Sequence, residues 1–465
     1  MILPGLPSSR PLALHPDNPH YFLFRDRPTI LITSAEHYGA VLNLDFDFRH
    51  YLDELHACGL NHTRLWSGTY REYPGFFGIE ENTLAPEPGR YLCPWLRSTA
   101  PGNRDGGAKF DLARWDSAYF ERLKAFMQEA SQRGIVVEMN LFCSIQNDDL
   151  WKINPMHAAN NVQAIGTCGA RDVYTLQHPE LTAVQEAVTR QIVRELAGFD
   201  NLYYEVCNEP YNGGVTQVWQ DHIAKVIVET EQGLPHPHLI SVNVANGSVK
   251  VEQPNPAISL FNFHYCTPPD VVAVNAGLNK PIGQNETGCR GRDDATYRSE
   301  GWDFILSGGA LYNNLDYSFS TVHPDGTAQV RNPGGGSRAL RQQLKFLKDF
   351  IEGFDFLRLS PHPSLLKGDL PKELTARVLA EPGKQYAIYI THAALGLPEP
   401  IASTHPTQIE LQLELAQGRY QVQWLNPTTG NLEASESLTH PGGLARLRSP
   451  VFLEDIALSV KRDAE

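Results

Sequence analysis

The feature that most constrains the fold of this chain is a regular alternation of short apolar runs with amphipathic segments, from about residue 30 to residue 350. Parallel strands that alternate with helices in this way predict a (β/α)8 (TIM) barrel. The alternative, a doubly wound open sheet, is disfavoured because no glycine-rich fingerprint follows the first strand. The eight expected strands lie near residues 30, 62, 136, 203, 239, 259, 282 and 311.

Individual segments carry the start and stop signals that such elements need. The helix expected over residues 116–134 has Asp116 as a candidate N-cap and Gly134 as its stop. The run IVVEMNLFC that follows is almost continuously apolar, as expected for a strand covered on both faces. Further helices are expected over residues 46–59, 178–198, 215–233, 269–278, 294–307 and 337–350.

The pattern changes after Phe354, where period-two segments are separated by proline and glycine turns. We therefore expect an antiparallel β-sandwich over residues 356–465, behind a barrel domain over residues 1–355 that includes a short N-terminal β extension. The sandwich has few aromatic residues, and a structural domain packed on the barrel is favoured over a carbohydrate-binding module. Those aromatic residues are Tyr386, Tyr389, Tyr420 and Trp424.

Composition narrows the class of partner. A formal net charge of −14 without a basic cluster argues against nucleic acid and against an anionic membrane surface, and it favours a neutral substrate. No run of about 18 apolar residues predicts a membrane-spanning helix. The N-terminal segment does not resemble a signal peptide, and the seven cysteines are scattered singly. A reduced, cytoplasmic protein without a cofactor or metal is expected, with export through a removed signal left open; the sequence does not predict an oligomeric state.

Two carboxylates fall at the ends of expected strands four and seven. The segment YYEVCNEPYNGG places Glu209 directly after strand four, and KPIGQNETG places Glu286 at the end of strand seven. Barrel enzymes carry their chemistry at the carboxyl ends of the strands, and strands four and seven lie on opposite sides of the barrel mouth. Glu209 and Glu286 are therefore expected to face each other.

Two opposed carboxylates suit the cleavage of a glycosidic bond. One must be protonated, so that it supplies a proton to the leaving oxygen, and the other must be ionised, so that it attacks or stabilises the sugar cation. A separation of roughly 5–5.5 Å gives a retaining double displacement, whereas roughly 6.5–9.5 Å leaves room for water and inverts.

Asn-Glu-Pro after strand four and a glutamate after strand seven resemble the clan A glycoside hydrolases, most closely the cellulase-like members. The resemblance covers about residues 25–350. It implies a retaining mechanism on β-type linkages, with Glu209 as the acid/base and Glu286 as the nucleophile. It also implies that Asn208 contacts the sugar 2-hydroxyl.

The same resemblance assigns roles at two other strand ends. His264 and Tyr265, at the end of strand six, match a pair in which the tyrosine hydroxyl orients the nucleophile. Arg64, in NHTRLW, occupies the strand-two position whose arginine keeps the nucleophile ionised. The chain departs from the family at strand eight, where GGALYNNLDYSFS has no tryptophan. A more polar subsite, or Tyr312 or Tyr317 as the sugar platform, is expected there.

Further substrate-binding residues are expected around the mouth. Glu36 and His37 follow strand one and are candidate sugar ligands. Trp66 begins a long, aromatic-rich connection over residues 67–110, and a second long connection spans residues 144–177. Long connections of this kind are commonly functional. Two such walls predict a pocket and favour an exo-acting enzyme.

Structural roles and other functions remain as alternatives. Glu209 alone would suit a helix start and Glu286 alone a turn, while Arg64, His264 and Tyr265 would suit core pairing or packing. A metal-dependent barrel hydrolase would use His37, His264 and acidic partners. A carbohydrate-binding protein would keep the aromatic walls without catalysis, and a transglycosylase would differ from a hydrolase in its products alone.

Overall fold

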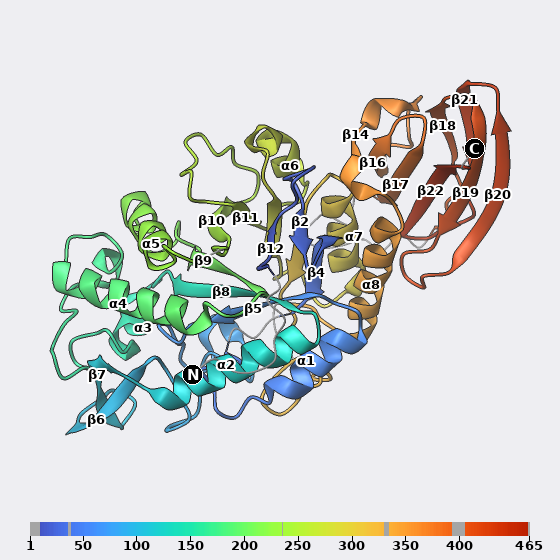
Figure 1. Ribbon diagram of the computed structural model, residues 1–465. Helices are drawn as coiled ribbons and strands as arrows, with labels where there is room; N and C mark the ends of the chain where they lie inside the picture. Colours follow the sequence, from blue (N-terminus) through green and yellow to red (C-terminus); the bar gives the residue numbers. More distant parts are fainter. Residues whose placement is uncertain (1–9, 36–38, 235, 330–333, 393–404, 464–465) are drawn as a thin grey trace.

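The computed structural model describes residues 10–35, 39–234, 236–329, 334–392 and 405–463. The chain forms a barrel of parallel strands and helices, followed by antiparallel sheets that lie beside helices α7 (Asp294–Ile305) and α8 (Arg338–Glu352) (Figure 1). No helix in the described part of the chain is both long and apolar enough to cross a membrane.

Eight parallel strands build the barrel, as the sequence predicts. The hydrogen-bonded order is β4-β13-β12-β11-β10-β9-β8-β5, so neighbours along the chain are neighbours in the sheet. The strands are β4 (Leu31–Ser34), β5 (His62–Trp66), β8 (Val136–Cys143), β9 (Leu202–Asn208), β10 (Ile240–Asn246), β11 (Leu260–His264), β12 (Ile282–Glu286) and β13 (Leu311–Asn314).

The seam between the first and second barrel strands is bridged by the side chain of Asn61. Its Oδ1 accepts from the backbone N–H of Ile32 at 2.9 Å, and its Nδ2 donates to the backbone carbonyl of Ile30 at 2.8 Å. The amide therefore supplies hydrogen bonds that a strand would otherwise make, and the backbone groups at the seam are satisfied.

Helices cover the outside of the barrel, and their starts follow ordinary capping rules. Asp116 caps α2 (Ser117–Gln132), as predicted, by accepting from the backbone N–H of Ala118 at 2.9 Å. Gly134 follows the helix with a positive φ of 70°, a conformation that glycine adopts without steric cost. The remaining helices are α1 (Phe48–Ala57), α3 (Asp148–Ile153), α4 (Pro179–Leu196), α5 (Gln217–Thr230), α6 (Asp270–Asn275), α7 and α8.

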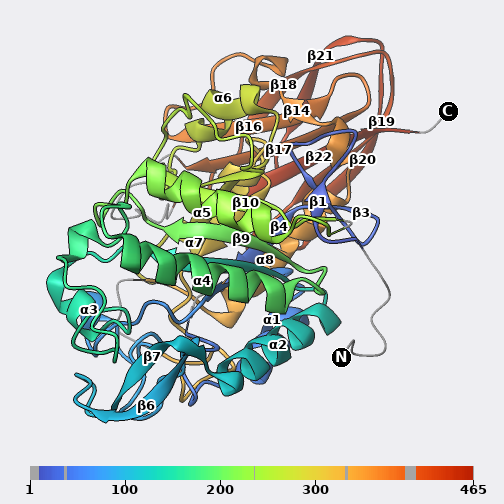
Figure 2. The same ribbon diagram turned by 60° about the vertical axis from the view of Figure 1, so that its left-hand side comes forward.

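Short sheets lie outside the barrel. Strands β1 (Ala13–Leu14), β2 (Phe22–Phe24) and β3 (Arg27–Thr29) form an N-terminal antiparallel sheet. Strands β6 (Trp95–Pro101) and β7 (Ala108–Trp115) form a hairpin within the long connection after β5. Figure 2 shows this hairpin at the end of the molecule away from the C-terminal sheets.

The C-terminal region consists of two antiparallel sheets around an apolar core. One sheet has the order β14-β16-β17-β22-β19-β20 and the other β15-β18-β21. Their strands are β14 (Ser360–Pro361), β15 (Leu366–Lys367), β16 (Leu374–Glu381), β17 (Gln385–His392), β18 (Glu410–Leu415), β19 (Gly418–Leu425), β20 (Leu432–His440), β21 (Gly443–Arg448) and β22 (Asp455–Arg462).

The larger sheet packs directly on the barrel helices. Tyr389 on β17 stacks on Trp302 of α7 with ring centroids 5.3 Å apart. Arg298 of α7, itself buried, forms an ion pair with Asp455 of β22 at 2.9 Å. The aromatic residues Tyr386, Tyr389, Tyr420 and Trp424 are all at most 2% exposed. Their rings therefore fill cores and offer no surface for stacking sugars, which agrees with a structural role for this region.

Candidate active site

Glu209 and Glu286 stand at the carboxyl ends of β9 and β12. The backbone of Glu209 has a φ of 48°, and its N–H donates to Oδ1 of Asn243 at 2.9 Å. A non-glycine residue in this left-handed region is strained unless its surroundings hold it there. Here the strand end, the Asn243 amide and Pro210 together turn the Glu209 side chain toward the barrel mouth.

The two carboxylates meet at His264, the last residue of β11. His264 Nδ1 lies 3.6 Å from Oε1 of Glu209 and 3.4 Å from Oε1 of Glu286. One ligand atom from each of the three residues lies within 4.8 Å of the others. The facing arrangement that the sequence predicts is therefore present, with fully buried His264 between and below the two carboxylates.

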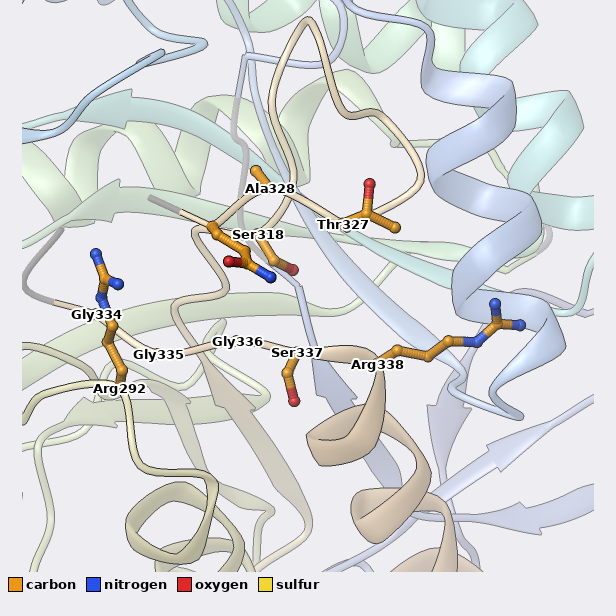
Figure 3. A pocket seen from close by; sticks show the side chains of 11 residues that line it. Arg292, Ser318, Thr327, Ala328, Gly334, Gly335, Gly336, Ser337 and Arg338 are labelled. Atoms are coloured by element: carbon orange, nitrogen blue, oxygen red, sulfur yellow. The ribbon is translucent and has the colours of Figure 1, made fainter. Parts of the chain in front are cut away.

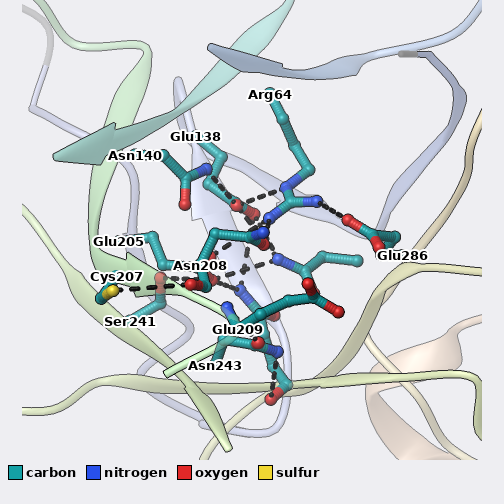
Figure 4. A network of polar contacts seen from close by, with 12 residues as sticks. Arg64, Glu138, Asn140, Glu205, Cys207, Asn208, Glu209, Ser241, Asn243 and Glu286 are labelled. Carbon is teal, nitrogen blue, oxygen red and sulfur yellow. Dashed lines mark hydrogen bonds and ion pairs between the residues drawn. The ribbon is translucent and has the colours of Figure 1, made fainter. Parts of the chain in front are cut away.

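Arg64 of β5 organises the floor beneath the site (Figure 4). Its Nη1 donates to Oε2 of Glu286 at 2.9 Å, and its Nη2 donates to Oδ1 of Asn208 at 2.7 Å. The Tyr265 hydroxyl donates to Oε1 of Glu286 at 3.2 Å. Positive charge and two donors on one carboxyl group favour its ionised form. The Asn208 oxygen is held by Arg64, and its Nδ2 donates to Sγ of Cys143 at 3.7 Å.

A second layer of carboxylates lies deeper in the barrel. Arg64 also donates to Glu138 on β8 at 2.6 Å and to Glu205 on β9 at 3.2 Å, and both side chains are fully buried. Although burial alone would raise it, the pKa of Glu138 is lowered to about 2 because Arg64, His62 and the Tyr203 hydroxyl stabilise its charge. Burial and the nearby Glu138 charge raise the pKa of Glu205 well above its usual value. Of the two buried carboxyl groups, Glu205 therefore has the higher affinity for a proton.

The carboxylate pair opens into a pocket of about 570 Å³, within the size range of small-molecule sites. Walls come from the long connections after β5 and β8 as well as from the strand ends. The lining residues are Trp66, Tyr70, Glu72, Phe77, Ile79, Asn82, Leu84, Cys143, Gln146, Asn208, Glu209, Asn212, Asn246, Tyr265, Glu286, Cys289, Leu315 and Tyr317.

The structure brings most of the predicted residues together but not all. Trp66 and Tyr317 line the pocket. Tyr312 does not: it is fully buried and its hydroxyl donates to the carbonyl of Tyr297 at 2.7 Å. Successive side chains of a strand point to opposite faces. Because Asn313 points into the barrel, where its amide donates to the Asn285 carbonyl, Tyr312 points out toward α7. The expectation of Tyr312 as a sugar platform is corrected accordingly.

The candidate ligands Glu36 and His37 lie outside the described residues. Arg64 and His264 are fully buried beneath the pocket and act on the carboxylates from below. Tyr317 and Leu315, from the segment after β13, line the pocket wall.

Several residues in or beneath the pocket were not predicted from the sequence. Glu72 and Gln146 come from connections whose conformation a sequence pattern does not predict, and Asn246 is the last residue of β10. Glu138 and Glu205 did carry a signal in the sequence, because each is the single carboxylate in a mainly apolar strand. Such a residue is almost never fully buried unless it is paired, so it indicates a partner inside the barrel.

The two candidate catalytic glutamates and His264 also have to be considered as metal ligands. Among the described residues, Glu209, His264 and Glu286 form the one group with the spacing of metal ligands. Arg64 already donates to Glu286 at 2.9 Å, so a cation at this position would have to compete with a fixed guanidinium.

A smaller pocket of about 380 Å³ lies near the start of α8 (Figure 3). It is lined by Arg292, Arg338 and the segment Gly334–Ser337 among others. The Ser337 hydroxyl is engaged, since it accepts from the backbone N–H of Leu340 and donates to Asp294. This pocket has no carboxylate among its described lining residues and thus lacks the chemistry of the barrel mouth.

Comparisons with known proteins support the fold. No family model matches the sequence, and no curated protein is significantly similar to it. Among solved structures, a Bacteroides vulgatus chain provisionally described as a glycoside hydrolase aligns with a TM-score of 0.67 and 15% identity, over 99% of this chain and 84% of that one.

Two further solved structures align with this chain in the same way. A glycoside hydrolase family 5 protein from Bacteroides vulgatus aligns with a TM-score of 0.64 and 12% identity, over 98% of this chain and 93% of that one. Another glycoside hydrolase aligns with a TM-score of 0.62 and 11% identity, over 98% of both chains. The chain therefore has the fold of these glycoside hydrolases over almost its whole length, and the predicted resemblance is confirmed at the level of the fold.

Proposed function

We propose that this protein is a retaining glycoside hydrolase that cleaves β-type bonds of neutral glycosides, with Glu209 as acid/base and Glu286 as nucleophile. The observation that carries the proposal is the meeting of two carboxylates from β9 and β12 within 4.8 Å of each other at the mouth of a barrel. The fold shared with glycoside hydrolases supports it independently.

The two carboxylates have different surroundings, and these assign the roles. Glu286 accepts from Arg64 and from the Tyr265 hydroxyl, which suits a permanently ionised nucleophile. Glu209 accepts from the neutral amide of Gln146 at 3.2 Å, and no lysine or arginine of the described residues forms an ion pair with it. An acid/base gives and takes a proton during the reaction, and a neutral hydrogen-bond partner suits that role better than a fixed cation does.

The reaction then takes two balanced steps. In the first, Glu286 attacks the anomeric carbon, the bond to the leaving oxygen breaks, and Glu209 gives its proton to that oxygen. In the second, Glu209 takes a proton from water, the water oxygen attacks the same carbon, and the ester bond to Glu286 breaks. Both residues return to their starting states.

The carboxylate separation supports retention of configuration. One oxygen of each carboxylate lies within 4.8 Å of the other, which is nearer to the roughly 5–5.5 Å of retaining enzymes than to the roughly 6.5–9.5 Å of inverting ones.

The pocket supports a short neutral substrate and an exo-acting mode. Its walls come from connections on more than one side of the barrel mouth, and aromatic rings such as Trp66 and Phe77 offer faces on which sugars stack. A net charge of −14 disfavours polyanionic substrates. All seven cysteines are free thiols, which fits a reducing compartment such as the cytoplasm.

Hydrolysis of a panel of aryl β-glycosides by wild type, Glu209→Ala and Glu286→Ala, each with and without azide, tests the proposal. We expect wild type to cleave at least one member. Azide should rescue Glu209→Ala to the β-glycosyl azide, because it replaces the water that the base activates, and Glu286→Ala to the α-glycosyl azide, because it replaces the nucleophile.

Two outcomes would overturn the proposal. Full activity of both variants would make the pair structural, and an absence of cleavage together with measurable sugar binding would favour a non-catalytic carbohydrate-binding protein. A parallel assay with chelator separates the metal-dependent alternative, since the proposed mechanism predicts unchanged activity.

A further inference from the structure

A third carboxyl group, Glu72, lies in the wall of the active-site pocket. It belongs to the connection after β5, and its backbone N–H donates to the carbonyl of Leu84 at 2.7 Å. Only 3% of the residue is exposed, yet it lines the pocket together with the two candidate catalytic glutamates. The proposed mechanism gives it no role.

The Glu72 side chain is held in place by neutral groups. The Tyr70 hydroxyl donates to its Oε1 at 3.1 Å, and Nδ2 of Asn82 donates to its Oε2 at 2.5 Å. No lysine, arginine or histidine in the described ranges forms an ion pair with it. Each carboxyl oxygen accepts two hydrogen bonds, so both oxygens of Glu72 keep capacity for one further donor.

Such a carboxyl group is costly where it stands. Burial without a cation is unfavourable, and burial together with the charges of Glu209 and Glu286 raises the pKa of Glu72 to about 7. Its neighbours in the wall include the apolar side chains of Ile79 and Leu84. If Glu72 only fastened the connection, a neutral amide would do so without this cost.

The chemistry of the Glu72 carboxyl group indicates the kind of ligand that it would contact. A sugar whose anomeric carbon lies between Glu209 and Glu286 directs its hydroxyl groups toward the surrounding walls, where an oriented carboxyl group is a strong acceptor. A third acidic group in the same pocket also repels a substrate that carries its own carboxylate. Both properties concern the sugar unit at which the reaction occurs.

We propose that Glu72 is a specificity-determining residue that accepts a hydrogen bond from a hydroxyl group of the reacting sugar and selects neutral glycosides over uronides. This inference rests on the proposed function and names the substrate class more narrowly. It also explains why the connection after β5 places a carboxyl group, and not an apolar side chain, between Tyr70 and Asn82.

The test compares wild type, Glu72→Gln and Glu72→Ala, with Glu87→Gln as a matched control, since Glu87 is an exposed glutamate of the same connection. The substrates are the aryl β-glycoside that wild type cleaves, its monodeoxy derivatives and the corresponding aryl β-uronide. Thermal unfolding of each variant shows whether it is folded, and Glu72→Gln keeps the shape of the side chain if the alanine variant does not fold.

We expect one deoxy derivative to lose about ten- to one-hundred-fold in kcat/KM with wild type, as for a hydrogen bond to a charged group. Glu72→Ala should show the same low kcat/KM with and without that hydroxyl. Glu72→Gln should improve the ratio of uronide to neutral glycoside, and Glu87→Gln should behave as wild type.

The inference is contradicted if the folded Glu72 variants keep the wild-type dependence on every hydroxyl and the wild-type discrimination against the uronide. That failure is distinct from failure of the proposed function, which would show as no cleavage by wild type or as full activity of Glu209→Ala and Glu286→Ala.

Discussion

The interior of the barrel and the interior of the C-terminal sheets are filled with opposite kinds of side chain. Beneath the barrel mouth, fully buried positions hold Arg64, Glu138, Glu205 and two asparagines, Asn262 and Asn285. Between the C-terminal sheets, equally buried positions hold aliphatic and aromatic residues such as Ile388, Leu413, Val422 and Trp424.

This difference in side chains shows that the two interiors serve different purposes. Apolar burial stabilises a fold at roughly 25 cal/mol per Å² and needs no partner. Buried charges stabilise little in net terms and require complete pairing. Glu138 shows the pairing, because its oxygens accept from Arg64 at 2.6 Å, from the Tyr203 hydroxyl at 2.6 Å and from Asn285 at 3.0 Å. We explain this network by what it does for Arg64: it holds the positively charged guanidinium fixed against Glu286.

The largest effect is expected on kcat, from a substitution of Glu286. Glu286→Gln keeps the size of the side chain and removes the nucleophile, so we expect kcat to fall by about 10⁴-fold or more, with little change in the melting temperature. Steady-state kinetics and calorimetry on the same preparation check both parts. A variant that kept a tenth of the wild-type activity would contradict the assignment.

Arg64→Lys should damage stability and activity together. A single ammonium group cannot reproduce the guanidinium's donors to Glu138, Glu205, Glu286 and Asn208. We expect the free energy of unfolding to fall by about 3–5 kcal/mol, measured by urea denaturation, and kcat/KM to fall as well. If Arg64→Lys lost stability but kept full activity, the network would be needed for folding and not for catalysis.

A matched change in the other interior should affect stability alone. Ile388→Ala, in the core between the C-terminal sheets, is expected to lower the free energy of unfolding by about 2–5 kcal/mol. Because this core lies on the far side of the larger sheet from the barrel helices, kcat/KM measured well below the melting temperature should equal that of wild type. A change in KM would instead show that the C-terminal region influences the pocket.

The smallest effect is expected for Glu205→Gln, because burial and the Glu138 charge keep the Glu205 carboxyl group protonated by raising its pKa. Near pH 5 the amide should change the free energy of unfolding by less than about 1 kcal/mol. A raised pKa contributes stability that is present below the unfolded pKa and lost as the pH rises.

Wild type should therefore lose stability relative to Glu205→Gln as the pH rises from about 5 through the neutral range. Urea unfolding of both proteins across this range measures the difference. If the difference in free energy of unfolding between the two proteins stayed constant with pH, or changed in the other direction, Glu205 would be ionised in the folded protein.

The sequence predicted the parts of this architecture that follow from periodicity. Apolar runs gave the barrel strands, and the carboxyl ends of strands four and seven placed Glu209 and Glu286, because strand order in a barrel determines which residues share its mouth. The Asp116 cap followed from local chemistry in the same way.

Other features depend on geometry that a sequence pattern does not contain. Tyr312 was misplaced because a one-residue change in the phase of a strand turns every side chain to the opposite face. Glu72 was missed because the path of a long connection is fixed by contacts such as those with Asn82 and Leu84. Asn61, which bridges the barrel seam, resembles any polar residue before a strand.

The measurement that tests the central claim most directly is the configuration of the first-formed product. Proton NMR during rapid hydrolysis of a cleaved aryl β-glycoside, recorded before mutarotation, distinguishes the two anomers. The proximity of Glu209 and Glu286 predicts that the β-anomer appears first. Initial release of the α-anomer would show direct attack by water and would contradict the assignment of Glu286 as nucleophile.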